Sequence, residues 1–154
     1  MGEYCTLDLF RDFTLEHLMS ARPPKQQGVC IIKIRKRGVA PEEIVRQLHQ
    51  QIVFLPPNLA KAGFRWIAGI RNITDCPVIY LGSTRPHSTH TLRERYVSLL
   101  HRSSVQYPLW TLLYYGWEMD FGWRVSDNPS DDEAELRRKY AERRQGMLPA
   151  LVHR

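Results

Sequence analysis

Apolar and polar residues alternate most regularly over residues 117–125, near the C-terminal end of the chain. The apolar residues that occupy every second position there are Trp117, Met119, Phe121, Trp123 and Val125. A period of two predicts an antiparallel strand with one buried face. We therefore expect these five side chains to lie in the core and the acids and arginine between them to point away from it.

A second strand is predicted over residues 28–36, where β-branched residues dominate. Ile32 and Ile34 fall on one face of this strand, and Lys33 and Arg35 fall on the other. Further along the chain, two short apolar runs, 64–71 and 77–82, are separated by the turn-prone segment Asn-Ile-Thr-Asp-Cys. These two runs predict a β-hairpin.

Helical patterns separate the predicted strands. A short helix is expected over 12–20, and a longer one begins at Pro41, with acids in its first turn and apolar residues at four-residue spacing. The remaining expected helices lie over 91–102, 108–116 and 127–146. The order of elements in the second half of the chain predicts an α+β fold in which helices pack on a small three-stranded antiparallel sheet of residues 64–71, 77–82 and 117–125. The earlier strand and helices form an N-terminal extension. We divide the chain into a domain over 64–154 and an N-terminal extension over 1–63, which is either separate or part of the same domain.

Composition narrows the class of protein. The 154 residues contain 22 Lys and Arg against 16 Asp and Glu, which gives a formal net charge of +6, and 43% of residues are hydrophobic. Such a chain has enough apolar surface to fold, and no apolar run is long enough to span a membrane. The three cysteines lack CxxC spacing, so neither a zinc site nor a disulfide framework is indicated. Without a secretory pattern at the N-terminus, we expect an intracellular protein, cytoplasmic or nuclear.

The positive charge is clustered. One cluster, Lys33, Arg35, Lys36 and Arg37, ends the first long predicted strand, and Arg102 belongs to a second group on the helix expected over 91–102. Clustered cations predict binding to the phosphate backbone of nucleic acid. We expect DNA as the partner, with RNA an open alternative, and a homodimer is compatible with the extension over residues 1–63.

Four short motifs follow one another on the predicted elements. They are Val78-Ile79-Tyr80-Leu81-Gly82-Ser83-Thr84, Leu92-Arg93-Glu94-Arg95, Glu133-Ala134-Glu135-Leu136-Arg137 and Pro149-Ala150-Leu151. Together they resemble the GIY-YIG nuclease superfamily, whose second motif, first-helix arginine, glutamate helix and closing segment occur in this order. The resemblance covers roughly residues 64–154.

The resemblance implies an endonuclease that hydrolyses phosphodiester bonds in DNA with one divalent metal ion, Mg²⁺ or Mn²⁺. It implies that Glu133 holds the metal, that Arg95 or its neighbour Arg93 neutralises charge on the phosphate, and that Tyr80 helps to activate water. These residue types suit the chemistry, because a carboxylate is a preferred Mg²⁺ ligand and an arginine stabilises developing phosphoryl charge.

Several positions depart from the family pattern or allow another interpretation. The first motif is represented either by Gly28-Val29-Cys30 or by Gly69-Ile70-Arg71, and neither contains its tyrosine. A valine, Val152, follows the closing Pro-Ala-Leu where the family has asparagine. These gaps favour an alternative function, a GIY-YIG-like module that binds nucleic acid or protein without cleaving.

Some individual residues also keep two interpretations. Glu133 completes a capping box with Ser130, which would explain it without a metal, and Glu135 is then the second candidate ligand. The less certain members of the site are His101, His153 and Cys30. A cysteine in a strand is usually a core residue and only rarely a nucleophile.

Overall fold

The computed structural model describes residues 6–85, 90–103 and 105–152. Its centre is a four-stranded antiparallel sheet with the order β1-β4-β2-β3. The strands are β1 (Thr14–His17), β2 (Gly28–Lys36), β3 (Val78–Ser83) and β4 (Glu118–Val125). The expected α+β class is confirmed, but the sheet differs from the expected three strands. Residues 64–71 are helical, and β1 and β2, which both belong to the predicted N-terminal extension, complete a sheet of four strands.

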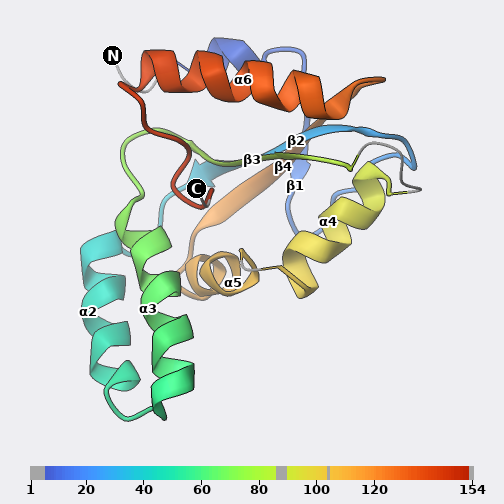
Figure 1. Cartoon of the computed structure of the whole chain (residues 1–154). Helices are drawn as coiled ribbons and strands as arrows, with labels where there is room; N and C mark the ends of the chain where they lie inside the picture. The colour runs from blue at the N-terminus through green and yellow to red at the C-terminus, as the bar shows by residue number, and fades with distance from the viewer. Residues whose placement is uncertain (1–5, 86–89, 104, 153–154) are drawn as a thin grey trace.

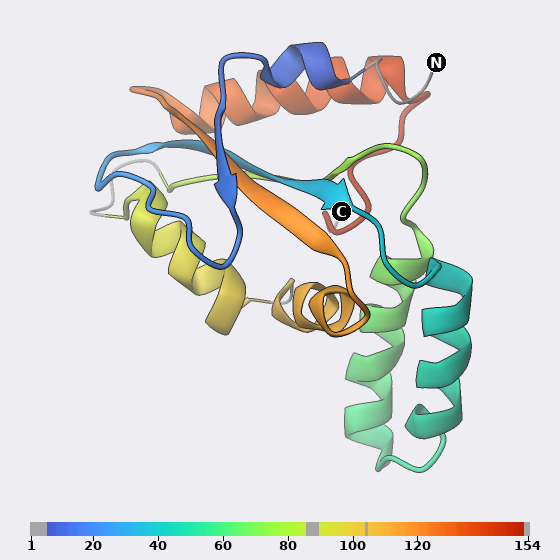
Figure 2. The same cartoon turned by 180° about the vertical axis from the view of Figure 1, so that it is seen from behind.

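Helices cover both faces of the sheet. On one face lie α6 (Pro129–Arg143) and the short 3₁₀ helix η1 (Leu7–Phe10), and on the other lie α4 (Leu92–His101) and α5 (Gln106–Tyr114) (Figure 1). Between β2 and β3 the chain forms a hairpin of α2 (Pro41–Ile52) and α3 (Pro57–Arg71), which projects away from the sheet (Figures 1 and 2). No helix in the described ranges is both long and apolar enough to cross a bilayer.

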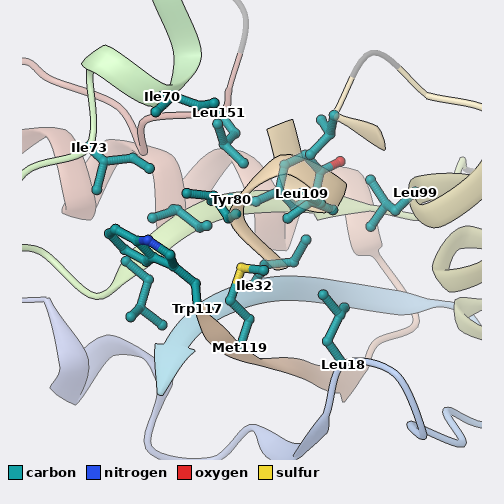
Figure 3. Packing of buried hydrophobic residues seen from close by; sticks show 14 of the residues in the cluster. Leu18, Ile32, Ile70, Ile73, Tyr80, Leu99, Leu109, Trp117, Met119 and Leu151 are labelled. Atoms are coloured by element: carbon teal, nitrogen blue, oxygen red, sulfur yellow. The ribbon is translucent and has the colours of Figure 1, made fainter. Parts of the chain in front are cut away.

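Strand β2 joins the two halves of the chain, because it pairs with β3 on one side and with β4 on the other. Its first five residues are buried, with alternate side chains on opposite faces. Cys30 and Ile32 enter the larger core, beneath α3, α4 and α5, and Val29 and Ile31 enter a smaller core against α6. The larger core includes Trp117, Met119 and Tyr80 among others (Figure 3).

The strand expected over residues 64–71 is wrong, because this segment is the C-terminal half of helix α3. Pro57 begins the helix at a position where its missing N–H costs nothing. Ile67 and Ile70 are buried three residues apart on one helical face, whereas Phe64 and Arg65 are exposed. A short apolar run does not by itself distinguish a strand from a buried helical face.

The helix expected over residues 12–20 is also wrong, because Thr14–His17 form the edge strand β1. This strand pairs with β4 in the register Thr14↔Trp123 to His17↔Asp120. Phe13 and Leu18, at its two ends, are buried in different cores. Pairing with a distant strand therefore overrides the local helical preference.

The predicted faces of β4 are correct only in its first part. Trp117, Met119 and Phe121 are fully buried as expected, but Trp123 is only partly buried and Val125 is 46% exposed at the end of the strand. Asp120, expected to point to solvent, is 8% exposed, and its carboxylate lies 3.9 Å from the Arg35 guanidinium. Helix α6 and η1 lie on the face of the sheet that the sequence assigns to solvent (Figure 1).

Candidate active site

The pairing of β2 with β3 brings one of the two candidate segments for the first motif beside Tyr80. Gly28-Val29-Cys30 lies directly beside the second motif, with Cys30 opposite Gly82 in the antiparallel register. Gly69-Ile70-Arg71 belongs to helix α3 and pairs with no strand. The two motifs are therefore adjacent in space although the α2–α3 hairpin separates them along the chain.

Tyr80 lies flat along the sheet because the next residue on its face is a glycine. A Cβ atom built on Gly82 would come within 2.4 Å of the Tyr80 hydroxyl and 2.9 Å of its ring. The absence of a side chain at Gly82 thus leaves the space that the Tyr80 ring occupies. This close approach explains why a tyrosine and a glycine stand two residues apart on this strand.

Arg95 is the arginine of α4 that reaches this site. Its Nη2 donates a hydrogen bond to the Tyr80 hydroxyl oxygen, and its guanidinium carbon lies 6.0 Å from the centre of the Tyr80 ring. The Arg95 Nε is buried and has no hydrogen-bond partner among the described residues. Arg93, the alternative on the same helix, is exposed and lies on another face of α4.

Glu133 reaches the same end of β3 from α6, on the opposite face of the sheet. Ser83 Oγ donates a 2.7 Å hydrogen bond to Glu133 Oε1, and Arg137 Nε lies 2.8 Å from Glu133 Oε2. The expected capping box is not formed: the helix begins at Pro129 and its N-cap residue, Asn128, makes no side-chain cap hydrogen bond. The Glu133 carboxylate is thus directed at β3 and not at the helix terminus.

Glu135, the second candidate carboxylate, lies away from β3. It is exposed, and its Oε1 atom lies 2.9 Å from Arg138 Nη2 and 3.5 Å from Lys139 Nζ. The hydrogen bond from Arg138 holds the pKa of Glu135 below its usual value. These contacts describe an ordinary solvated helix face.

Burial has the largest effect on the pKa values of the Tyr80 hydroxyl and the Cys30 thiol, the two weak acids in the interior of the site. It raises the pKa of Tyr80 to about 12, although the Arg95 charge opposes this shift. It likewise raises the pKa of the Cys30 thiol to about 12, with Glu133 adding to the shift and Arg95 opposing it. Both groups therefore keep their protons at neutral pH, and Cys30 is a core thiol without the thiolate character of a nucleophile.

Burial also acts on Arg95, whose positive charge it disfavours. Electrostatic interactions outweigh this penalty and raise the pKa of Arg95 above its usual value. They come from Tyr80, Cys30 and Glu133. The guanidinium is thus permanently charged in a partly buried position, where an interaction with an anion is stronger than in water.

The donor set suits a metal ion that keeps most of its own water. In the ranges that the structure describes, no three His, Cys, Asp or Glu side chains gather as a metal-binding group. Glu133 is the one carboxylate at the site, with the Ser83 hydroxyl beside it. Mg²⁺ is commonly held by one or two carboxylates together with water and substrate phosphate, so the residues fit Mg²⁺ or Mn²⁺ and do not fit a tightly caged ion.

A basic hollow of about 540 Å³ runs along the outer face of α4, the helix that carries Arg95. Lys25, Arg93 and Arg102 line it, together with His90, Glu94, Val97 and Ser98. Arg102 was expected to bind nucleic acid, whereas Lys25 was not, because it stands alone in a proline-rich loop. Only the packing of that loop against α4 brings Lys25 beside the arginines.

The other expected basic cluster, Lys33 to Arg37, lies at the opposite end of β2 from Cys30. Six residues of strand separate Cys30 from Lys36, a distance of about 20 Å. Two of its arginines have partners within the fold: Arg35 lies 3.9 Å from Asp120, and Arg37 donates to the Thr74 carbonyl oxygen and stacks 5.3 Å from the Trp117 ring centre. Lys36 is exposed and Lys33 is half-buried.

The remaining expected residues lie outside the site or outside the described ranges. His101 is exposed at the end of α4, with its ring 6.3 Å from the Trp110 ring. The Pro149-Ala150-Leu151 segment contacts β3 through one backbone hydrogen bond, in which Leu151 N donates to the Ile79 carbonyl oxygen at 2.8 Å. His153 is not among the described residues.

Sequence analysis missed Ser83 and Arg137 as members of the site. Both lie within the quoted motifs, since Ser83 follows Tyr-Leu-Gly and Arg137 ends Glu-Ala-Glu-Leu-Arg, but neither was assigned a role. The four-residue spacing of Glu133 and Arg137 was a sufficient signal for their ion pair. No local signal connects Ser83 with Glu133, which are 50 residues apart.

Comparison of the chain with protein-family models, with curated proteins and with solved structures finds no match.

Proposed function

We propose that this protein is a metal-dependent endonuclease that cleaves phosphodiester bonds in DNA. The observation that carries the proposal is the convergence of Arg95 from α4 and Glu133 from α6 on the end of β3 that holds Tyr80 and Ser83. The motifs that resemble the GIY-YIG nucleases supply these same residues. The basic hollow on another face of α4 adds three cations, Lys25, Arg93 and Arg102, which suit a polyanionic substrate.

In this proposal the chain's own residues position and neutralise the phosphate. Arg95, fixed by its hydrogen bond to Tyr80, presents a permanent charge to the scissile phosphate, where negative charge builds up during attack. The Tyr80 hydroxyl, protonated at neutral pH in a buried position, accepts the hydrogen bond from Arg95 and so orients the guanidinium. Lys25, Arg93 and Arg102 hold the neighbouring backbone.

Glu133 is the residue that would hold the metal ion, which when bound supplies Lewis-acid stabilisation of the phosphoryl oxygens. A carboxylate has about four lone-pair sites, so Glu133 retains acceptor capacity beyond its contacts with Ser83 and Arg137. The Ser83 hydrogen bond orients the carboxylate. The Arg137 contact limits the negative charge that Glu133 offers to a metal ion.

Two observations favour a second candidate function, a nucleic-acid-binding module that does not cleave. Cys30 stands beside the second motif in place of a tyrosine, and its protonated thiol accepts no proton at neutral pH. Arg137 already partly neutralises Glu133. In this alternative the basic hollow along α4 binds the backbone and the carboxylate serves only its ion pair.

The two functions differ in a direct cleavage assay. Purified protein is incubated with supercoiled plasmid and with single-stranded DNA, each in Mg²⁺, in Mn²⁺ and in EDTA. We expect nicking or linearisation with either metal and none with EDTA. Retardation of DNA without cleavage in any metal would instead establish the binding module, and neither binding nor cleavage would reject both functions.

We expect the cleavage rate to rise with pH, by about tenfold per unit between pH 6 and 9, because solvent hydroxide must take the proton of the attacking water. Tyr80 and Cys30 both have a pKa raised to about 12 and remain protonated over this range. The measurement is kcat as a function of pH for wild type and for Cys30→Ala, whose profile should have the same shape. A bell-shaped profile centred near neutrality would show that a side chain is the base.

DNA binding should be mainly electrostatic. If about four to six phosphates are contacted, log affinity falls with log salt concentration at a slope of roughly −4 to −5. Replacing Arg93 or Lys25 by Ala should reduce this slope by about one unit. Arg138→Ala is the matched control, because Arg138 is an exposed arginine paired with Glu135 and Glu142 outside the hollow. An equal effect of Arg138→Ala would show that overall charge and not the hollow binds DNA.

A further inference from the structure

The α2–α3 hairpin ends in an uncharged apolar tip, which we define as residues 53–57. The tip lies at the end of the hairpin that is farthest from the sheet (Figures 1 and 2). Phe54 is 86% exposed and Val53 is 69% exposed. No Asp, Glu, Lys or Arg occurs from Gln47 to Ala60, although a quarter of the chain is charged. Exposed apolar surface of this kind marks a site of protein association.

An aromatic groove lies against the same hairpin, beside the α2 residues that lead to the tip. It has a volume of about 400 Å³, and its ring residues are Trp66, Tyr107, Trp110, Tyr114 and Tyr115. Gln47 and Gln51 of α2 border it, and none of its lining residues is charged. Tyr114 is 84% exposed and Tyr107 is 57% exposed. Without cations this groove does not suit a phosphate backbone, whereas neutral aromatic surfaces are typical of the centres of protein interfaces.

The tip is a turn in which Phe54 N and Leu55 N donate hydrogen bonds to the Gln51 and Ile52 carbonyl oxygens, at 3.2 and 2.9 Å. Pro56 has φ −55° and ψ 150°, which is polyproline II geometry, and Pro57 follows it at the start of α3. The tip does not fill the groove of its own chain, since Phe54 and Leu55 are exposed.

We propose that two copies of this chain form a twofold dimer in which each tip inserts Phe54, Leu55 and Pro56 into the aromatic groove of the other copy. Gln47, at the groove, is six helical residues from Val53, a separation of about 9 Å along α2. Two hairpins that lie antiparallel around a twofold axis therefore place each tip on the partner's groove. Such an arrangement is self-complementary and closes at two copies.

The dimer explains two exposed surfaces with one contact. It buries phenylalanine, tyrosine and tryptophan, and of these tyrosine and tryptophan are enriched among the residues that dominate binding. It leaves the site at Tyr80, Arg95 and Glu133 uncovered, because that site lies on α4, β3 and α6, elements outside the hairpin. The proposal therefore stands or falls independently of cleavage.

The test is sedimentation equilibrium of the full chain over a wide concentration range, with one variant for each surface. We expect the wild type to dimerise, and both Phe54→Asp and Tyr114→Asp to weaken the dimer by at least roughly a hundredfold, because each substitution places a charge in both symmetric contacts. Both residues are more than four-fifths exposed, so the fold should be retained, which circular dichroism and the thermal midpoint verify. Met19→Asp, an exposed apolar residue outside the hairpin, is the control and should dimerise as the wild type does.

Mixing the two variants decides whether the tip meets the groove. Phe54→Asp retains an intact groove and Tyr114→Asp retains an intact tip, so the mixture restores one of the two contacts. We expect heterodimers at concentrations at which each variant alone is monomeric. A monomeric wild type, a dimer that either variant leaves unchanged, or a mixture that remains monomeric would each overturn the proposal.

Discussion

Glu133→Gln should reduce metal-dependent cleavage by several orders of magnitude. The substitution keeps the size of the side chain and an oxygen that accepts the hydrogen bond from Ser83 Oγ. It removes the negative charge that would hold Mg²⁺, and stabilisation of phosphoryl charge by a metal amounts to several kcal/mol of the barrier. The measurement is single-turnover cleavage of a DNA substrate in Mg²⁺, at matched thermal stability of the two proteins.

Glu135→Gln is the control for this prediction, because it makes the same change two residues further along the same helix. Glu135 is exposed and paired with Arg138 and Lys139, away from β3. The cleavage rate of Glu135→Gln should therefore equal that of the wild type. DNA binding in the absence of metal should be unchanged or slightly tighter for Glu133→Gln. Equal cleavage by Glu133→Gln and wild type would show that this carboxylate does not hold the metal.

Phe121→Ala should destabilise the protein by roughly 3–5 kcal/mol, the usual cost of truncating a fully buried phenylalanine. Phe121 is 0% exposed at the centre of the sheet, and its ring packs edge-on against Tyr96 with ring centres 5.1 Å apart. For a domain of this size, the loss corresponds to a thermal midpoint lowered by about 10 °C or more. Chemical denaturation monitored by circular dichroism gives the free energy of unfolding directly.

Trp123→Ala is the comparison for that measurement. Trp123 is larger than Phe121 and two residues along the same strand, but it is only partly buried. The Trp123→Ala substitution should therefore lower the free energy of unfolding by less than Phe121→Ala does, although it removes more atoms. The opposite order of stabilities would show that Trp123, and not Phe121, is the more deeply buried side chain of β4.

Elements with strong local signals were predictable from the amino-acid sequence alone. The helix that starts at Pro41 and strand β2 were predicted over the residues that form them, because proline, first-turn acids and β-branched runs act within a few residues. Tyr80, Arg95 and Glu133 were likewise selected from short motifs. Their side chains do come to one end of β3, although the motifs alone do not state which atoms meet.

Strand pairing and the burial of each face depend on long-range packing that no local pattern contains. Residues 64–71 carry an apolar run that suits a strand or a helix, and the helix is formed because Ile67 and Ile70 then face the core. Residues 14–17 become a strand because the edge of β4 is open to them. In both cases a contact with a distant segment outweighs a weak local preference.

The candidate site depends on the same kind of long-range contact. Cys30 takes its place opposite Gly82 only after a 41-residue segment, from 37 to 77, is folded out of the way as the α2–α3 hairpin and its connections. The capping box at Ser130 and Glu133 has the right sequence spacing, yet the helix begins at Pro129 and Glu133 bonds to Ser83. Spacing along the chain determines which residues are available, and packing determines which atoms they reach, because the partner that satisfies a buried polar group comes from another element.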